Sequence, residues 1–181
     1  LLAQFALIES SYNPTAKAKT SSATGLYQHI DGTWMGLVRE NRIPGVNPNM
    51  PTAEALALRT NPLYSALGGA AYLQQNAKTI KSNNPGDLYL AHFSGPGSAK
   101  RIIRACDSGN GGQSLEEVLG VKTATRMKNA NPQLRSMDAA GLRAWAAKKI
   151  SGTMVNGVPT ATAVAVPPPK VEARANPRPQ A

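Results

Sequence analysis

The first 150 residues show almost no alternation of apolar and polar residues at a spacing of two. A half-buried strand needs that alternation, whereas a helix places its apolar residues three or four positions apart. Asparagine-proline pairs divide the same region into short segments, because asparagine caps a helix and proline suits the first helical position. The sequence therefore predicts an all-α fold of mainly short helices, which suits a compact globular domain better than an up-and-down bundle.

Capping and proline signals place the ends of the expected helices. The expected segments are a first helix that stops before residue 13, followed by 32–40, 52–59, 62–81, 86–93, 98–106, 115–119, 122–128 and 136–150. Asp31 and Thr52 are expected to cap the helices that follow them, and Ser114 begins a capping box. Within the longest segment, Leu63 is expected to face inward, and Gly68-Gly69 would let another helix approach closely.

The composition changes near residue 153, where valine, alanine, threonine and proline replace the helical pattern. We therefore expect one globular domain over 1–152 and a Pro-rich extended linker or disordered tail over 153–181. The sequence starts at Leu1 within an expected helix, so we interpret it as a fragment or a processed form in which no targeting segment is visible. No apolar run approaches the ~18 residues that a membrane helix needs.

The numbers of cysteine, histidine and charged residues limit the kinds of site that the chain can form. Cys106 is the single cysteine, which excludes a disulfide within the chain, and two histidines add few metal ligands. We therefore expect neither a metal nor another cofactor. The net charge of +10 favours polyanions such as nucleic acid, anionic membrane or bacterial wall polymer. No nucleic-acid-binding motif accompanies the charge and aromatic residues are only 5%, so we interpret it as a solvated basic face without a specific nucleic-acid partner.

The stretch from Leu1 to Gln28 carries the strongest functional signal. Its apolar residues lie on one arc of a helix, and Glu9 falls inside that arc, between Phe5 and Leu2. Burying a carboxylate is costly unless it is paired or protonated. A buried carboxyl that keeps its proton near neutral pH suits a general acid. The alternative, non-catalytic role for Glu9 is that of a buried structural acid paired with an arginine.

Three short motifs follow one another in a recognisable order. They are Glu9-Ser10 with Asn13-Pro14 shortly after, Gly25-Leu26-Tyr27-Gln28, and Ala91-His92-Phe93-Ser94-Gly95. This order resembles the catalytic domain of the soluble lytic transglycosylases, a lysozyme-like family that cleaves peptidoglycan. The resemblance covers about residues 1 to 100 and thins towards 150. Tyr27 replaces the family's usual Met, and His92 and Phe93 replace a Tyr and an Asn.

The resemblance implies a lysozyme-like globular domain in which Glu9 is the only catalytic carboxylate. Glu9 would protonate the leaving oxygen of the MurNAc-β-1,4-GlcNAc bond and then accept a proton from the muramic acid C6 hydroxyl. The product would be a 1,6-anhydroMurNAc end. The expected substrate-binding residues are Ser10, Gln28, Tyr27, Ile30, Tyr89, His92 and Phe93.

Several of these residues have structural alternatives. Ser10 is either a helix-end hydroxyl or a group that orients Glu9 or the N-acetyl group of the substrate. Gln28 either donates to the substrate or closes a loop through its amide. The aromatic candidates and His92 are equally consistent with core or rim packing.

Two other functions remain open from the sequence. A hydrolytic muramidase would need a second group across the sugar, for example Asp31, although helix capping is the favoured role of that residue. A non-catalytic wall-binding or assembly protein would grip peptidoglycan strands on the same scaffold. All three readings imply action in the periplasm or cell wall. They allow a bacteriolytic role in wall turnover, secretion or conjugation machinery, or on a phage virion as part of a larger envelope-spanning assembly.

Overall fold

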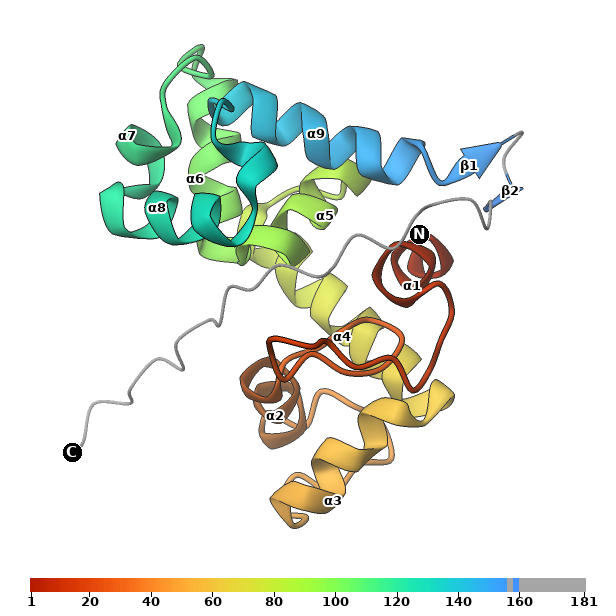
Figure 1. The fold of residues 1–181 in the computed structure, drawn as a ribbon. Coiled ribbons are helices and arrows are strands. Elements are labelled where there is room, and N and C mark those ends of the chain that lie inside the picture. Colours follow the sequence, from red (N-terminus) through yellow and green to blue (C-terminus); the bar gives the residue numbers. More distant parts are fainter. Residues whose placement is uncertain (156–157, 160–181) are drawn as a thin grey trace, which may run out of the picture.

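The computed structural model describes residues 1–155 and 158–159, and these are almost entirely helical (Figure 1). The α-helices are α1 (Leu2–Ser10), α2 (Asp31–Arg39), α3 (Thr52–Ala57), α4 (Pro62–Ile80), α5 (Pro85–Ser94), α6 (Pro96–Asp107), α7 (Leu115–Leu119), α8 (Val121–Ala130) and α9 (Ala139–Ser151). Short 3₁₀ turns occupy Leu58–Thr60 and Pro132–Leu134. The predicted all-α fold of mainly short helices is confirmed.

Helix α4 connects two hydrophobic clusters. The smaller cluster contains Trp34, Leu37 and Val38 from α2, together with Ala55 from α3 and Ala71 from α4. The larger cluster is built mainly from α5, α6 and α9 and also receives side chains from α1, α7 and α8. Figure 1 shows α2 and α3 at the lower end of α4 and α5, α6 and α9 above its upper end. The two halves of the domain therefore share one helix.

Two glycines in the middle of α4 make this arrangement possible. A Cβ atom on Gly68 would overlap the ring of Trp34, and one on Gly69 would lie 2.9 Å from the ring of Tyr27. The close approach expected at these glycines therefore occurs, but aromatic rings rather than another helix fill the space. Trp34 is completely buried and its ring nitrogen donates to the carbonyl of Ala55 at 2.7 Å, which fixes the ring against α4.

Three predicted caps are confirmed. The side chain of Asn61 accepts from the backbone at the start of α4, and that of Asn84 does the same for α5. Ser114 and Glu117 form the expected capping box at α7. In each case a polar side chain satisfies amide groups that have no partner within the helix.

Five local predictions are wrong. The last helix begins at Ala139 rather than at residue 136, because the side chain of Asp138 caps it. Asp31 and Thr52 are the first residues of α2 and α3, whose N-cap positions belong to Ile30 and Pro51. Helix α6 begins at Pro96 rather than at residue 98, because proline suits the first turn of a helix. Leu63 is 63% exposed, since it occupies the second position of α4, beyond the reach of either cluster.

The end of the described chain forms a small hairpin. Strand β1 (Met154–Val155) pairs antiparallel with β2 (Val158–Pro159), so that Met154 lies opposite Pro159. Most of the predicted tail, residues 156–157 and 160–181, lies outside the described residues, so the division at residue 152 stays a prediction. In the described part of the chain, no helix combines the length and the apolar character that crossing a membrane requires.

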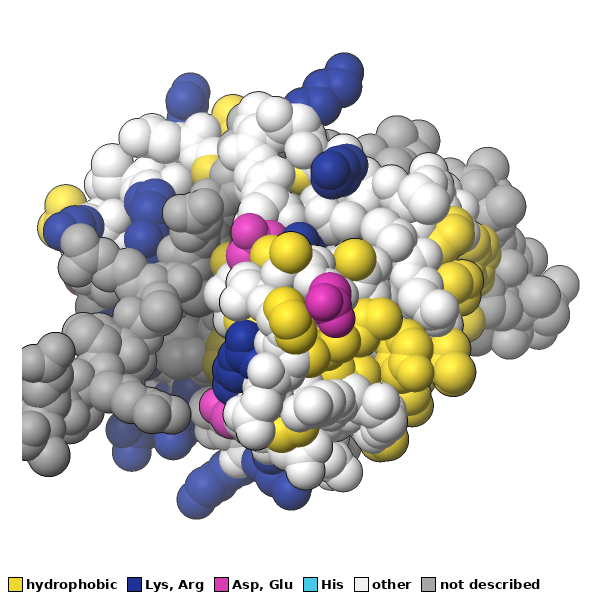
Figure 2. Space-filling model, turned by 90° about the horizontal axis from the view of Figure 1, so that it is seen from below, with side chains coloured by type: hydrophobic (Ala, Val, Ile, Leu, Met, Phe, Trp, Pro, Cys, Tyr) yellow, Lys and Arg dark blue, Asp and Glu magenta, His cyan; other side chains and the backbone are white. Residues whose placement is uncertain are grey.

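The surface seen from below combines scattered charge with an apolar region. Figure 2 shows hydrophobic side chains gathered on one part of this face, whereas Lys and Arg side chains are distributed around its edge. On the part of this face that the described residues form, the cations make no continuous stripe.

The contact between α4 and Trp34 generates a stability prediction. Gly68→Ala should lower the free energy of unfolding, because overpacking against a buried ring costs about 1–3 kcal/mol and exceeds the helix propensity gained. Gly36→Ala is the matched control, since nothing lies within 4 Å of its added Cβ atom. It should leave stability unchanged or raise it by up to about 1 kcal/mol. Urea unfolding of both variants measures the difference, and equal stabilities would contradict the packing argument.

Candidate active site

Glu9 lies near the end of α1 and is 5% exposed. The last six residues of this helix, Phe5 to Ser10, are all buried. The expected burial of Glu9 is thus confirmed, but it follows from a helix end that is enclosed on all sides rather than from a single apolar stripe. The helix ends because Ser11 and Tyr12 both adopt left-handed backbone conformations, with φ of 52° and 62°.

The carboxyl group of Glu9 makes one polar contact. Its Oε1 lies 3.5 Å from Nε2 of His92, and its Oε2 is buried with no hydrogen-bond partner among the described residues. No arginine pairs with Glu9 in the part of the chain that the structure describes, which argues against the structural ion pair considered from the sequence. A buried polar atom without a partner is costly to the folded state, and such sites are often functional.

Aromatic rings surround the contact between Glu9 and His92. The His92 ring packs edge-on against Phe5 from α1 and Tyr72 from α4, with centroid distances of 5.3 and 5.8 Å. Tyr89 stacks on the same imidazole at 6.4 Å. Burial raises the pKa of Tyr89 well above its usual range, and the nearby charge of Glu9 raises it further. Tyr89 is therefore a neutral phenol at any pH near 7.

Ser10 joins the first two sequence motifs. Its hydroxyl lies 2.9 Å from the carbonyl of Ala6, one turn back in α1, and 3.0 Å from the carbonyl of Leu26 in the second motif. This places Ser10 as a tie between the helix and the turn that follows it along the chain. Both bonds are to backbone oxygens, which favours the structural role considered for this hydroxyl.

The second motif is a tight turn that only glycine can begin. Gly25 has φ of 85°, and a Cβ atom there would collide with the carbonyl of Arg59. Gln28 ends the turn, also with positive φ, and its Nε2 donates to the carbonyls of Gly25 and Ala16 at 2.9 and 3.2 Å. The amide of Gln28 therefore closes the loop, which is one of the two roles expected for it.

Arg59 holds this turn against the rest of the domain. Its guanidinium donates to the carbonyls of Ser22 and His29, both at 2.8 Å, and pairs with Asp31 at 2.8 Å. Asp31 is consequently engaged by a buried cation rather than acting as a helix cap. Sequence reasoning missed Arg59, because the bonds that it makes span 30 and 37 positions and leave no local pattern.

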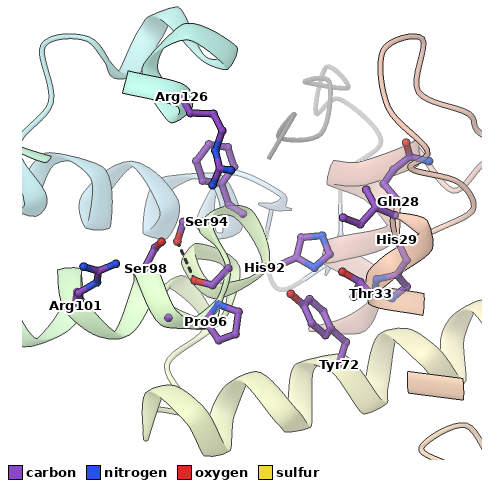
Figure 3. Close-up of a pocket in the computed structure, with 14 residues that line it drawn as sticks. Gln28, His29, Thr33, Tyr72, His92, Ser94, Pro96, Ser98, Arg101 and Arg126 are labelled. Atoms are coloured by element: carbon purple, nitrogen blue, oxygen red, sulfur yellow. Dashed lines mark hydrogen bonds between the residues drawn. The ribbon is translucent and has the colours of Figure 1, made fainter. Parts of the chain in front are cut away.

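A cavity of about 310 Å³ opens between the two halves of the domain (Figure 3). Its lining includes Gln28, His29, Ile30, Thr33, Tyr72, His92, Phe93, Ser94, Ser98, Arg101 and Arg126. One wall comes from the turn, α2 and α4, and the other from the end of α5, α6 and α8. Glu9 does not line the cavity, and His92 is the lining residue that contacts it.

The structure separates the sequence-predicted residues into two groups. Gln28, Ile30, His92 and Phe93 line the cavity. Ser10, Tyr27 and Tyr89 are buried and lie outside the lining, so they support the site from behind. The substrate contacts of both groups stay predictions.

Sequence reasoning missed several lining residues: His29, Thr33, Tyr72, Arg101 and Arg126. His29 directly follows the second motif, and this proximity is the one signal that was available for it. Arg101 lies in α6, which follows the third motif directly, whereas Arg126 lies in α8, about 30 positions beyond that motif.

His29 is a neutral histidine in the wall of the cavity. Its pKa is lowered from 6.5 to about 3, mainly by burial and additionally by the charges of His92 and Arg59. Its Nε2 has no hydrogen-bond partner in the described structure.

Lys149 is a partly buried cation whose pKa burial lowers, although the charge of Glu9 acts in the opposite direction. Among the residues described, no group of three or more acidic, histidine or cysteine side chains could hold a metal ion.

A comparison with protein families identifies the family of this fold. The family model described as "Transglycosylase SLT domain" matches residues 1–112. The matched region contains α1 to α6, and thus Glu9, the turn at Gly25–Gln28 and the third motif. Of the two arginines that line the cavity, Arg101 lies inside the matched region and Arg126 lies beyond it.

The depressed pKa of His29 makes stability depend on pH. Below pH 6.5 the unfolded chain takes up a proton at His29 that the folded chain does not accept until about pH 3, so stability falls as the pH falls through this window. Between pH 8 and pH 5 this one group should cost about 2 kcal/mol.

Urea unfolding at both pH values measures the effect. Between pH 8 and pH 5, the free energy of unfolding of His29→Phe should fall by about 2 kcal/mol less than that of the wild type, because phenylalanine cannot take up the proton. Thr33→Ala, which alters the same wall and keeps the histidine, should retain the wild-type loss. Identical pH dependence in His29→Phe and the wild type would show that His29 is not held neutral.

Proposed function

Because the chain belongs to the transglycosylase SLT family, we propose that it is a lytic transglycosylase that cleaves the glycan strands of peptidoglycan. The observation that carries the proposal is the carboxyl group of Glu9, which is buried beside the cavity and makes no hydrogen bond among the described residues. The family match covers the motif that contains it.

In this proposal Glu9 is the general acid for the MurNAc-β-1,4-GlcNAc bond. The Glu9 proton goes to O4 of GlcNAc as the bond from C1 of MurNAc to that oxygen breaks. No donor among the described residues occupies Oε2 of Glu9, so this oxygen is free to transfer a proton and to take one back. His92 lies at the boundary between Glu9 and the cavity, and its ring must turn aside for Glu9 to reach a bound strand.

The second half of the reaction uses no protein nucleophile. The Glu9 carboxylate takes the proton of the C6 hydroxyl while O6 bonds to C1, which closes the 1,6-anhydro ring and restores the acid. The substrate's N-acetyl group stabilises the charge that develops at C1. This route is favoured because no acidic side chain lines the cavity in the described part of the chain, and Asp31 is paired with Arg59.

The proposal also concerns where the protein acts. Its substrate lies outside the cytoplasm, so the protein would work in the periplasm or cell wall. Membership in a larger secretion, conjugation or phage virion assembly stays a prediction from the sequence. The positive charge supports contact with an anionic envelope in any of these settings.

Glu9→Gln tests the assignment of the acid. The amide keeps the size of the side chain but cannot donate the proton, so the clearing of a purified wall suspension should fall at least about 100-fold. Glu40→Gln, at an exposed acid that follows α2, should retain wild-type activity. Circular dichroism melts confirm that both variants fold. Wall clearing by Glu9→Gln at near the wild-type rate would exclude Glu9 as the acid.

The reaction product tests the choice between transglycosylase and hydrolase. Mass spectrometry of the digested wall should find muropeptides that end in 1,6-anhydroMurNAc, because no water enters the reaction. A muramidase would instead release reducing ends that are 18 Da heavier, and that result would replace the proposed mechanism. A wall-binding protein without activity would release neither product while still sedimenting with the wall.

A further inference from the structure

The cavity has walls of different electrostatic character (Figure 3). Gln28, His29 and Thr33 form an uncharged side, because the depressed pKa of His29 keeps that ring neutral. Arg101 from α6 and Arg126 from α8 lie on the other side, near Ser94 and Ser98. The two guanidinium groups are the permanent charges of the lining, which includes no acid among the described residues.

Neither of these arginines is engaged by the protein in the described structure. Arg59 and Arg143 each pair with an aspartate, and Lys128 pairs with Glu116. Arg101 and Arg126 make no ion pair and no side-chain hydrogen bond within residues 1–155 and 158–159. Like charges that share one cavity repel, so an anion bound between them would relieve that repulsion.

The chemistry of the arginines defines the anion. A guanidinium presents a planar fork of donors that matches a carboxylate, and such charge-assisted bonds are among the strongest hydrogen bonds in proteins. N-acetylated sugar rings are neutral, so the sugars alone cannot account for two cations. In a peptidoglycan strand the carboxylates belong to the short peptides carried by the lactyl group of muramic acid.

We propose that Arg101 and Arg126 form a subsite for a carboxylate of the peptide carried by the glycan strand. The proposal rests on the proposed function and adds a specificity to it: the enzyme prefers strands that keep their peptides. The uncharged wall would receive the sugar beside His92, and the arginine wall would receive the acidic substituent. This arrangement orients the strand across the cavity, because one end of the ligand is charged and the other is not.

Arg101→Gln, Arg126→Gln and the double variant test the subsite on chemically defined walls. The substrates are native wall strands, the same strands with their carboxylates converted to neutral amides, and strands stripped of peptides. On native strands each single variant should lower kcat/KM about fivefold, and the double variant about 20-fold. On amidated strands the wild type should fall to the level of the double variant, which should itself change little.

Arg104→Gln is the matched control, because Arg104 is exposed like Arg101 and Arg126 and belongs to the same helix as Arg101, but does not line the cavity. It should change kcat/KM less than twofold on every substrate. An equal loss in this control would overturn the subsite in favour of general attraction by the charged surface. An equal loss on native and amidated strands in the double variant would overturn it in favour of a contact with the sugar. A full arginine effect on stripped strands, which keep a free lactyl carboxylate, would overturn the assignment to the peptide.

A direct binding measurement separates this inference from the proposed function. Muramyl dipeptide and its amidated form are titrated into the wild type and the double variant, with calorimetry as the readout. The subsite predicts that the wild type binds the acidic form more tightly, and that the double variant loses this preference. If the wild type shows the preference but cleaves no wall, the subsite stands and the proposed reaction fails. If it cleaves wall without the preference, the reaction stands and the subsite fails.

Discussion

The buried guanidinium of Arg59 determines the shape of one side of the site. It binds two backbone carbonyls of the turn-bearing loop and the carboxylate of Asp31 at the start of α2. A buried cation needs such partners, because its charge has left water. Arg59 lies in the 3₁₀ turn that precedes α4, about 30 positions from its partners along the chain. It therefore fixes the turn at Gly25, the neutral His29 and the position of α2 from a distant segment. Without this ion, the uncharged wall of the cavity would lose the bonds that join the loop at Ser22 and His29 to the start of α2.

Against this arrangement, the site contains buried polar atoms without a hydrogen-bond partner among the described residues, in Glu9 and in His29. Aromatic rings and backbone-directed hydrogen bonds hold His92, Ser10 and Gln28. The Glu9 carboxyl has a single polar contact, to the imidazole of His92, in the described structure. A folded chain tolerates such a group only where the surrounding packing compensates its cost. The arrangement is typical of a site in which the missing hydrogen bond is supplied by a substrate.

Local chemistry explains what could be predicted from the sequence. The caps at Asn61, Asn84 and Ser114 depend on neighbours within three residues, and the burial of Glu9 depends on the apolar residues of its own helix. The exposed position of Leu63 and the partner of Asp31 depend on which elements meet in space. The same limit applies to the cavity, whose walls come from segments nearly 100 positions apart. Motif order predicts Glu9 as the acid, whereas only folding brings Arg101 and Arg126 into the same cavity lining as Gln28 and His92.

The helix shared by both hydrophobic clusters has a mechanical consequence. Hinge closure requires a flexible segment between two bodies, yet α4 is continuous across the cavity and the rings of Trp34 and Tyr27 brace its glycine pair. The walls thus cannot swing apart about α4 without losing those contacts. Opening toward Glu9 is left to the rotation of single side chains, which occurs on a far shorter timescale than domain movement. In the proposed mechanism, the width of the groove is therefore fixed, and the His92 ring is the side chain that turns aside.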